Sequence, residues 1–257
     1  MSILEVKELS KSFGGIKAVS DLNFHVKKGE ILSIIGPNGA GKTTVFNLIT
    51  GFYKADKGNI IFSNQDITGF NTEKRVNLGI ARTFQNLRLF KSMSVFENVL
   101  TASLVKHRYG FIPTILRTGS FCTTKKKAEE KARYLINFFG LTEKESYLAT
   151  SLPYGDQRKL EIARALATEP KLLLVDEPCA GMNHSEINQI IDAFFKIREA
   201  FKTTIIIIEH HMELVMNISE RIIVIDFGEK IMEGKPEEVK KDRRVIEAYL
   251  GEDYQGE

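Results

Sequence analysis

The chain has 257 residues, of which 43% are hydrophobic and 27% are charged, the composition of an ordinary globular protein without a disordered bias. Its 36 basic and 33 acidic residues leave a formal net charge of +3, which is too small to indicate a nucleic-acid partner. No apolar run approaches the ~20 residues that span a bilayer, so any role at a membrane is expected to come through a partner. Two distant cysteines, Cys122 and Cys179, favour a reduced, cytosolic setting, and the N-terminal segment does not predict a signal peptide.

The first thirty residues alternate between polar and apolar side chains, a pattern typical of a half-exposed antiparallel sheet. This alternation predicts strands at 3–9 and 22–26, with Phe13 near the tip of the turn between them. The next run, 31–35, is short, apolar and β-branched, and it predicts a buried strand.

The predicted strand leads into a glycine-rich segment, Gly36 to Thr43, that reads G-x-x-x-x-G-K-T. This is the phosphate-binding loop, in which glycines let backbone N–H groups approach phosphate oxygens, lysine adds a positive charge and threonine can ligate Mg²⁺. Residues 44–50 are compatible with a helix that Gly51 caps, so the strand–loop–helix context is present. The residues predicted to bind the nucleotide are Gly36, Pro37, Asn38, Gly39, Ala40, Gly41, Lys42, Thr43 and Thr44.

A helical region follows two further predicted strands, at 59–62 and at 79–85, the second of which ends in Gln85. Ser94 with an acid three residues later predicts a capping box. The segment 106–127 is expected to be an irregular insertion, and its basic end, 125–127, most simply a solvated helix start rather than a phosphate or lipid contact. An apolar stripe at helical spacing predicts a helix through Ala128, Ala132, Leu135, Ile136 and Phe139.

The rest of the chain returns to buried strands, predicted at 171–176, 203–208, 221–225 and 230–232, with a one-sided apolar helix between the first two. Such alternation predicts an α/β protein with a mostly parallel sheet, whose ligand lies beyond the carboxyl ends of its strands. Asp176 and Glu177 end one strand, where Asp176 suits Mg²⁺ and Glu177 suits a base that polarises water. His210 ends the next strand and is expected to approach the γ-phosphate, with a surface role as the alternative.

The order of these motifs resembles the ATP-binding cassette (ABC) ATPases across nearly the whole chain. The resemblance implies that Phe13 stacks on adenine, that 36–43 is the Walker A loop and that 172–177 is Walker B. It implies ATP and Mg²⁺ as cofactors, with Mg²⁺ held by Thr43, Gln85 and Asp176, and catalysis by Glu177, His210 and Gln85. Residues 180–183 match the D-loop. The signature motif, which would meet the ATP of a partner cassette, falls on Leu152, Pro153, Tyr154, Gly155, Asp156 and Gln157.

The same resemblance implies the domain organisation. A single ABC ATPase domain, 1–257, would contain an ATP-binding core of 1–85 and 161–235, a helical signature subdomain of 86–160 and a C-terminal helical tail of 236–257. The expected fold is a P-loop nucleotide-binding cassette with a mostly parallel core sheet, an N-terminal antiparallel β-subdomain and an inserted α-helical subdomain.

Three stretches, 79–90, 152–161 and 245–251, resemble the larger ATP-binding subunit of branched-chain amino-acid importers. That branch implies two permease subunits, a second ABC ATPase in a heterodimer (a homodimer is the alternative) and an external substrate-binding protein. It also implies a place on the cytoplasmic face of the inner membrane, held through the permeases, and no nucleic acid. Lipid or lipopolysaccharide export and a soluble, non-transport ABC protein remain the alternatives. A kinase or GTPase is disfavoured because no acceptor site or base-specificity motif is visible.

The signature departs from the usual L-S-G-G-Q, since Pro153, Tyr154 and Asp156 replace serine, glycine and glutamine. Because proline lacks the serine hydroxyl, the two ATP sites of the assembled pair are expected to be unequal. Asp156 is expected to cap a helix over 157–167, in preference to contacting the nucleotide. His211 stands where the family commonly has an acid, and it is expected to be neutral to the reaction.

Overall fold

The structure is a computed structural model that describes residues 1–105 and 119–253. It divides into two compact units, each described here by itself: Met1–Arg82 with Lys171–Glu257, and Thr83–Pro170. Among the helices of the described ranges, none combines the length and apolar composition that crossing a bilayer requires.

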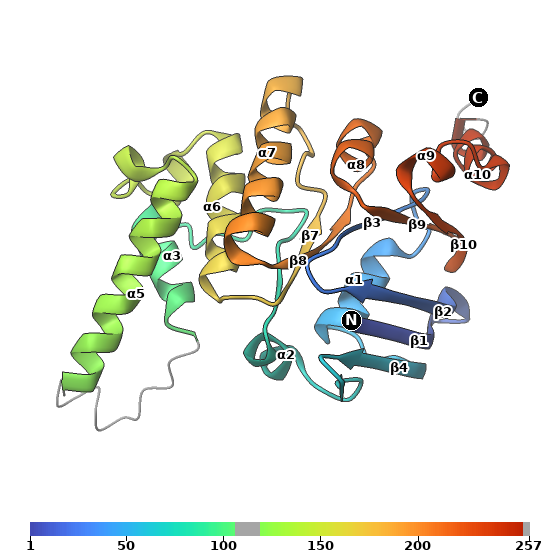
Figure 1. Ribbon diagram of the computed structural model, residues 1–257, viewed down its shortest axis with the longest axis horizontal. Helices are drawn as coiled ribbons and strands as arrows, with labels where there is room; N and C mark the ends of the chain where they lie inside the picture. The colour runs from blue at the N-terminus through green and yellow to red at the C-terminus, as the bar shows by residue number, and fades with distance from the viewer. Residues whose placement is uncertain (106–118, 254–257) are drawn as a thin grey trace. The chain divides into compact units, whose positions relative to one another are not determined.

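The first unit begins with an antiparallel sheet of four strands in the order β2-β1-β4-β5 (Figure 1). Leu4 and Val6 of β1 are buried at alternate positions, as the sequence predicted, whereas Leu9 is buried beyond a register shift that breaks the alternation. Phe13, the last residue of β1, pairs with Ile16 across the turn. The strands are β1 Ser2–Phe13, β2 Ile16–Lys27, β4 Lys57–Phe62 and β5 Gln65–Asp66.

The same unit holds a six-stranded sheet in the order β10-β9-β3-β8-β7-β6, parallel throughout except for the terminal β10. Every residue of β3, β7 and β8 is buried, because these continuous apolar runs are covered on both faces. The mostly parallel core sheet is thereby confirmed. The strands are β3 Ile31–Ile35, β6 Ile80–Arg82, β7 Leu172–Asp176, β8 Thr204–Ile208, β9 Arg221–Asp226 and β10 Glu229–Gly234.

One predicted strand boundary is wrong. The strand expected over 79–85 ends at Arg82, so Gln85 follows the strand instead of ending it. β6 is the terminal strand of the sheet and pairs only with β7, through the three residues Ile80 to Arg82. Beyond that ladder nothing in the sheet holds the backbone extended.

In the first unit, helix α1 is followed by Gly51, the C-cap that the sequence predicted. Gly41 and Gly51 flank α1 with positive φ angles of 100° and 78°, which a residue with a Cβ rarely adopts. In α7, one face buries Ile187, Ile190, Ile191, Phe194 and Ile197. The helices are α1 Lys42–Thr50, α2 Thr72–Leu78, α7 His184–Phe201, α8 Met212–Ile218, α9 Pro236–Val239 and α10 Arg243–Asp253.

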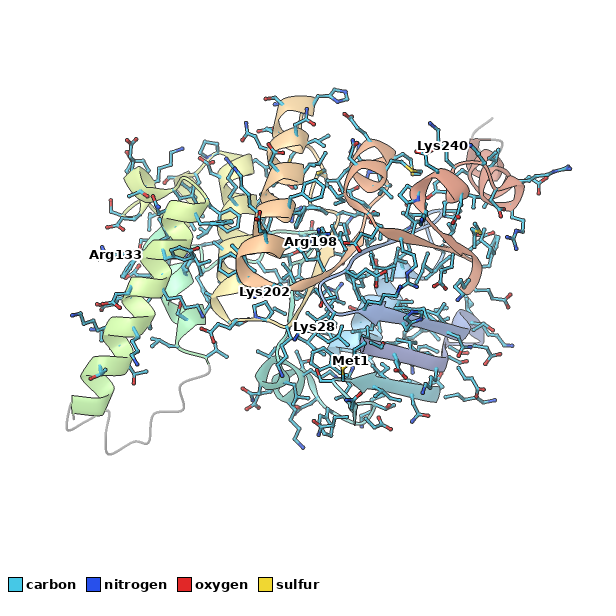
Figure 2. The ribbon with its side chains drawn as sticks, viewed as in Figure 1. Met1, Lys28, Arg133, Arg198, Lys202 and Lys240 are labelled. Carbon is cyan, nitrogen blue, oxygen red and sulfur yellow. The ribbon has the colours of Figure 1, made fainter. Side chains whose placement is uncertain are left out.

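The second unit is helical. Its main helices are α3 Val95–Ser103, α5 Gly119–Phe138 and α6 Tyr154–Ala167, which pack on one another, and the predicted capping box of Ser94 and Glu97 is present. Figure 2 labels Arg133 on α5. Its guanidinium carbon lies 4.8 Å from the centroid of the Phe96 ring of α3. Residues 119–127 are helical, so the prediction of an irregular insertion is wrong there; 106–118 lie outside the described residues. The basic run 125–127 is exposed on α5, as expected.

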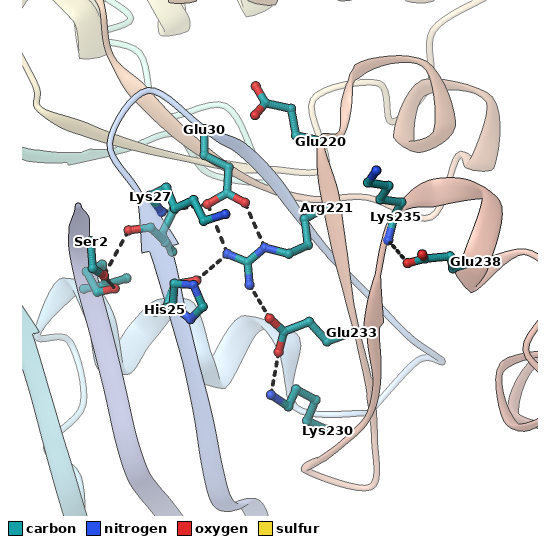
Figure 3. Close-up of polar contacts among 12 residues, drawn as sticks. Ser2, His25, Lys27, Glu30, Glu220, Arg221, Lys230, Glu233, Lys235 and Glu238 are labelled. Atoms are coloured by element: carbon teal, nitrogen blue, oxygen red, sulfur yellow. Dashed lines mark hydrogen bonds and ion pairs between the residues drawn. The ribbon is translucent and has the colours of Figure 1, made fainter.

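Within the first unit, Arg221 links the two sheets (Figure 3). Its guanidinium donates to both carboxylate oxygens of Glu30, at 2.8 and 3.0 Å, and to the backbone oxygen of His25 on β2, at 2.6 Å. It also pairs with Glu233 of β10, which Lys230 contacts at 2.5 Å. The arginine therefore contacts four acceptor atoms of three residues around one planar fork, a geometry that lysine cannot reproduce.

Arg221→Met is expected to lower the free energy of unfolding by about 2–4 kcal/mol, because it leaves the buried Glu30 carboxylate without its cation and removes one of the two cations that contact Glu233. Chemical denaturation measures the change. Arg243→Met is the matched control: the Arg243 side chain is 91% exposed, and its ion pair with Glu247 is expected to contribute less than about 1 kcal/mol. Equal stabilities of the two variants would contradict the linking role of Arg221.

The same network predicts that the free energy of unfolding depends on pH. Burial raises the pKa of the Glu233 carboxyl, but Lys230 and Arg221 lower it more, so the pKa lies below its ordinary value of 4.5. A carboxyl with a depressed folded pKa stabilises the protein above the unfolded pKa and loses that contribution as the pH falls. The stability difference between wild type and Arg221→Met is therefore expected to narrow below about pH 4.5.

Candidate functional site

The first unit gathers three predicted segments at one edge of its parallel sheet. Strands β3, β8 and β7 are neighbours in that order, and all three run in the same direction. Their carboxyl ends therefore lie at the same edge, where Gly36 follows β3, Glu177 follows β7 and Glu209 follows β8. This is the place where α/β proteins of this type bind ligands.

The loop from Gly36 to Gly41 requires glycine for two different reasons. Gly36 and Gly41 have φ angles of 149° and 100°, and a Cβ at either position would lie 1.9 Å from the Ile225 oxygen or 2.2 Å from the Ala18 oxygen. Gly39 also has a positive φ, of 78°, but faces open space. Close contact with neighbouring backbone thus requires glycine at 36 and 41, and the positive φ angle favours glycine at 39.

Lys42 lies over this loop and begins helix α1. Its Nζ donates to the backbone oxygens of Gly36, at 2.5 Å, and Pro37, at 2.7 Å, and the residue is only 8% exposed. The next residue, Thr43, is exposed and Thr44 partly so. A helix N-terminus, backbone N–H groups and a buried ammonium group converge here, which is the arrangement that binds phosphate.

The hairpin that carries Phe13 packs beside the loop. The backbone at Ala18 of β2 closely approaches Gly41 and Gly228, and the Ser20 N–H donates to the Gly228 oxygen at 2.9 Å. The Phe13 ring is partly exposed and meets the Tyr53 ring edge-on, with centroids 5.1 Å apart. An exposed aromatic surface is available to a flat ring system.

Asp176 is buried at the end of β7, where its Oδ2 accepts from Arg82 Nη2 at 2.6 Å. Arg82 Nη1 also donates to the Asn47 side chain of α1, at 2.6 Å, so one arginine joins the strand-end acid to the loop helix. The sequence analysis missed this function of Arg82. The sequence signal that could have indicated it is the charge of Arg82 at the end of a short apolar strand.

Glu177 and His210 lie close together. The distance from His210 Nδ1 to Glu177 Oε1 is 4.0 Å, and the His210 side chain is half-exposed. Glu177 has a φ of 46°, unusual for a residue with a side chain, and its N–H donates to the Ile208 oxygen of β8 at 2.9 Å. Backbone conformations of this kind persist where surrounding structure enforces them, often at functional sites.

Glu209 is a second residue that the sequence analysis missed. Its buried carboxylate accepts from the Cys179 N–H through Oε1, at 2.9 Å. Oε2 accepts from the N–H groups of His210 and His211, at 2.8 and 3.0 Å. One side chain thus fixes the backbone after Glu177 to the backbone that carries His210. An acid directly before the histidine, at the end of an apolar run, was its only sequence signal.

Glu209→Gln is expected to lower the turnover number about 10-fold and the free energy of unfolding by about 1–3 kcal/mol. The amide keeps a single acceptor oxygen, so it can satisfy one of the two backbone segments, while its NH₂ group faces an N–H donor. Steady-state ATPase kinetics and chemical denaturation measure both effects. Glu237→Gln, at an exposed position of α9, is the control. A wild-type turnover number in Glu209→Gln would contradict the prediction.

The signature residues and Gln85 belong to the second unit. Leu152 is buried, Pro153 and Tyr154 are exposed, and Gly155 to Gln157 are partly exposed. Helix α6 begins at Tyr154 with Pro153 as its N-cap residue, so the expectation that Asp156 caps a helix over 157–167 is wrong. Asp156 lies within the first turn and pairs with Lys144 at 2.5 Å and Lys159 at 3.5 Å. A proline is unfavourable inside a helix because it lacks the backbone N–H, but it leaves the residues after it free to be helical. The helix therefore begins directly after Pro153, at Tyr154.

Comparisons with known proteins indicate the family of the chain. Residues 19–180 match the family model for "ABC transporter", and residues 229–255 match that for "Branched-chain amino acid ATP-binding cassette transporter". The chain is 43% identical to the high-affinity branched-chain amino acid transport ATP-binding protein LivG of Escherichia coli K12, over 97% of this chain and 98% of that protein. The high-affinity branched-chain amino acid transport ATP-binding protein BraF of Pseudomonas aeruginosa is also 43% identical, over 97% of this chain and 98% of that protein.

Solved structures agree as well. The crystal structure of the ADP conformation of an ATP-binding cassette of an ABC transporter superposes with a TM-score of 0.85 and 34% identity, over 98% of this chain and 99% of that one. A dimeric cassette in a post-hydrolysis state, bound to ADP and Pi, gives a TM-score of 0.77 and 25% identity, over 91% and 98%.

The chain belongs to the ABC transporter family, and it is an ATPase whose ATP hydrolysis is coupled to transport. Within that family it belongs with the ATP-binding subunits of branched-chain amino acid transporters. The resemblance and the cassette fold inferred from the motifs are thereby confirmed.

Proposed function

We propose that this chain energises the import of branched-chain or similarly hydrophobic amino acids. The observation that carries the proposal is the match of residues 229–255 to the branched-chain cassette model, beside 43% identity to LivG over nearly the full length. The ATPase does not contact cargo in this scheme. Selection falls to two permease subunits and an external substrate-binding protein, and the chain is held at the cytoplasmic face of the membrane through the permeases.

The residue functions are part of the proposal. The loop N–H groups and Lys42 bind the phosphates of ATP, and adenine stacks on Phe13. Thr43 and Asp176, with Gln85 as a third oxygen donor, hold Mg²⁺, because hydroxyl, carboxylate and amide oxygens are the donors it prefers. Supporting this fit, Thr43 is exposed at the start of α1, and Asp176 lies at the same edge of the sheet. When bound, Mg²⁺ neutralises charge that develops on the phosphates.

Glu177 orients and polarises the attacking water, and His210 contacts the γ-phosphate. Their proximity supports a joint function in one step, since the attack requires a positioned water and a stabilised phosphoryl group together. Arg82 keeps the Asp176 carboxylate directed by holding its Oδ2. Catalysis by this set depends on positioning and electrostatics more than on covalent chemistry.

A second cassette completes the site in this proposal, preferably a different subunit, with a homodimer as the alternative. A dimeric cassette among the similar structures supports pairing. Each signature motif then meets the ATP bound by the partner. The site completed by Pro153 and Asp156 is the weaker one, because proline provides no hydroxyl.

The test is uptake in proteoliposomes. The chain is reconstituted with the permeases, second cassette and binding protein of its own transporter, and ATP-dependent accumulation of radiolabelled leucine, isoleucine and valine is measured. Accumulation that is lost in Glu177→Gln and absent for lysine or glucose supports the proposal. ATP-dependent movement of lipid without amino-acid uptake would overturn it in favour of an exporter.

A further inference from the structure

A buried arginine of the signature helix holds the backbone that carries Gln85. Arg158 of α6 has a side chain only 2% exposed. Its Nη1 donates to the Phe84 oxygen at 2.7 Å and to Glu161 Oε2 at 3.1 Å. Its Nη2 donates to the Gln85 oxygen and to the Tyr154 hydroxyl, the latter at 3.0 Å. Four groups from two segments, the 84–85 backbone and helix α6, thus converge on one guanidinium within the second unit.

Glu161, one turn further along α6, completes the arrangement. Its Oε1 accepts from the N–H groups of Phe84 and Arg88, at 3.3 and 3.4 Å. Burial raises the pKa of the Glu161 carboxyl, and the Arg158 charge together with these two N–H groups opposes that rise. The ionised form of the Glu161 carboxyl is therefore stabilised by Arg158. Together the two side chains bond backbone N–H groups and backbone oxygens of the segment from Phe84 to Arg88.

This geometry suits arginine and no other side chain. The planar guanidinium presents five donors in a fixed fork, so it can bond two successive peptide oxygens, a carboxylate and a hydroxyl at once. Lysine carries the same charge, but its single ammonium group cannot bond all four of these partners at once. Since the segment lies beyond the end of β6, no sheet ladder holds these carbonyl groups.

Tyr154 connects this arrangement to the surface. The residue is 43% exposed, while its hydroxyl accepts a hydrogen bond from Arg158 and the guanidinium carbon lies 5.5 Å from its ring centroid. Tyrosine replaces the first glycine of the usual signature motif, and a glycine could make neither contact. The substitution therefore adds a physical link from the signature loop to the Gln85 backbone.

We propose that Arg158 is a positioning residue that couples the two ATP sites of the assembled transporter: Tyr154, at the partner's nucleotide, restrains the guanidinium that positions the Phe84 and Gln85 carbonyl groups. The inference rests on the proposed functions of Gln85 and of the signature motif. Nucleotide held against Tyr154 by the partner cassette then changes how firmly the Gln85 segment of this chain is held. Coupling of this kind needs a contiguous element that both sites bias, and the arginine supplies one.

The first test uses the full chain alone. Hydrogen exchange is measured at the Phe84 and Arg88 amides, which Glu161 holds. Tyr154→Phe removes only a hydroxyl and is expected to speed exchange about 3-fold, whereas Arg158→Lys is expected to speed it about 10-fold. Tyr147→Phe, at an exposed tyrosine of the same unit, is the control and should leave the rates unchanged. Unchanged rates in Arg158→Lys would overturn the proposed positioning.

The second test uses the assembled transporter. Tyr154→Phe and Arg158→Lys are expected to lower the turnover number about 5- to 10-fold while KM for ATP changes less than about 2-fold. In a Gln85→Ala background, where no side chain remains to be positioned, Tyr154→Phe should have no further effect. Additive losses in that double-mutant cycle would overturn the coupling.

Lys42→Ala separates this inference from the proposed function. If it leaves ATP turnover unchanged, the phosphate-site assignment fails, independently of Arg158. If it abolishes turnover while Tyr154→Phe and Arg158→Lys behave as wild type in both tests, the ATPase assignment stands and only the coupling inference is overturned.

Discussion

Glu177→Gln is expected to reduce ATP turnover of the assembled transporter about 100-fold or more while ATP still binds. The amide has nearly the same shape but cannot accept a proton or polarise the attacking water, and general bases contribute about 10²–10⁴-fold to rates. The backbone bond from the Glu177 N–H to the Ile208 oxygen does not involve the side chain, so the fold is retained. Single-turnover kinetics with radiolabelled ATP separate binding from hydrolysis.

The matched control is Glu199→Gln, which makes the same change at an exposed position of α7 in the same unit. It should leave both binding and turnover at wild-type values. Repeating the acid-to-amide change in the second cassette subunit tests the expected inequality of the two sites. Residual turnover above about a tenth of wild type in a transporter whose two cassettes both carry the acid-to-amide change would show that another group acts as the base.

Lys42→Ala is expected to weaken ATP binding to the isolated chain by about 100-fold or more. The ammonium group is held over the loop by the Gly36 and Pro37 oxygens, so it is already in place for a phosphate. Losing one or two charge-assisted hydrogen bonds, at about 1.5–3 kcal/mol each, accounts for a change of this size. Titration calorimetry with ATP and Mg²⁺ measures it.

Lys196→Ala, at an exposed position of α7, removes the same charge from the same unit and controls for the overall field. A thermal melt of each variant without nucleotide checks that the loop still folds. Near wild-type affinity in a folded Lys42→Ala would refute the assignment of the loop as the phosphate site.

Much of the fold was predictable because it depends on local patterns. The runs 31–35, 171–176 and 203–208 are continuous and apolar, and the fully buried parallel strands β3, β7 and β8 lie there. The ends of strands and helices were less predictable where adjacent strands or adjacent residues determine them. β6 stops at Arg82 because it is a terminal strand with one partner, and α6 begins at Tyr154 because Pro153 precedes it.

The candidate site likewise contains residues that local sequence patterns predict and residues that only tertiary contacts reveal. Glycines at 36, 39 and 41, a lysine at 42 and acids at the end of an apolar run are recognisable because each is required at a fixed spacing by local backbone geometry. The ion pair of Arg82 with Asp176 has no such spacing, since the partners meet only because β6 lies beside β7. Glu209 was missed for the same reason: its partner Cys179 is brought near by the pairing of β7 with β8.

The sequence by itself determined that this chain binds nucleotide on a glycine loop and that it resembles the branched-chain amino-acid cassettes. It could do so because loop conformation, strand burial and helix caps follow from residues within one or two turns of each other. The tertiary structure alone decided which buried charged side chains connect segments that are distant in the sequence: Arg82 and Glu209 in the first unit, and Arg158 in the second. Their partners are set by strand order and helix packing, and the low dielectric of the interior makes such pairs strong only once those elements have come together.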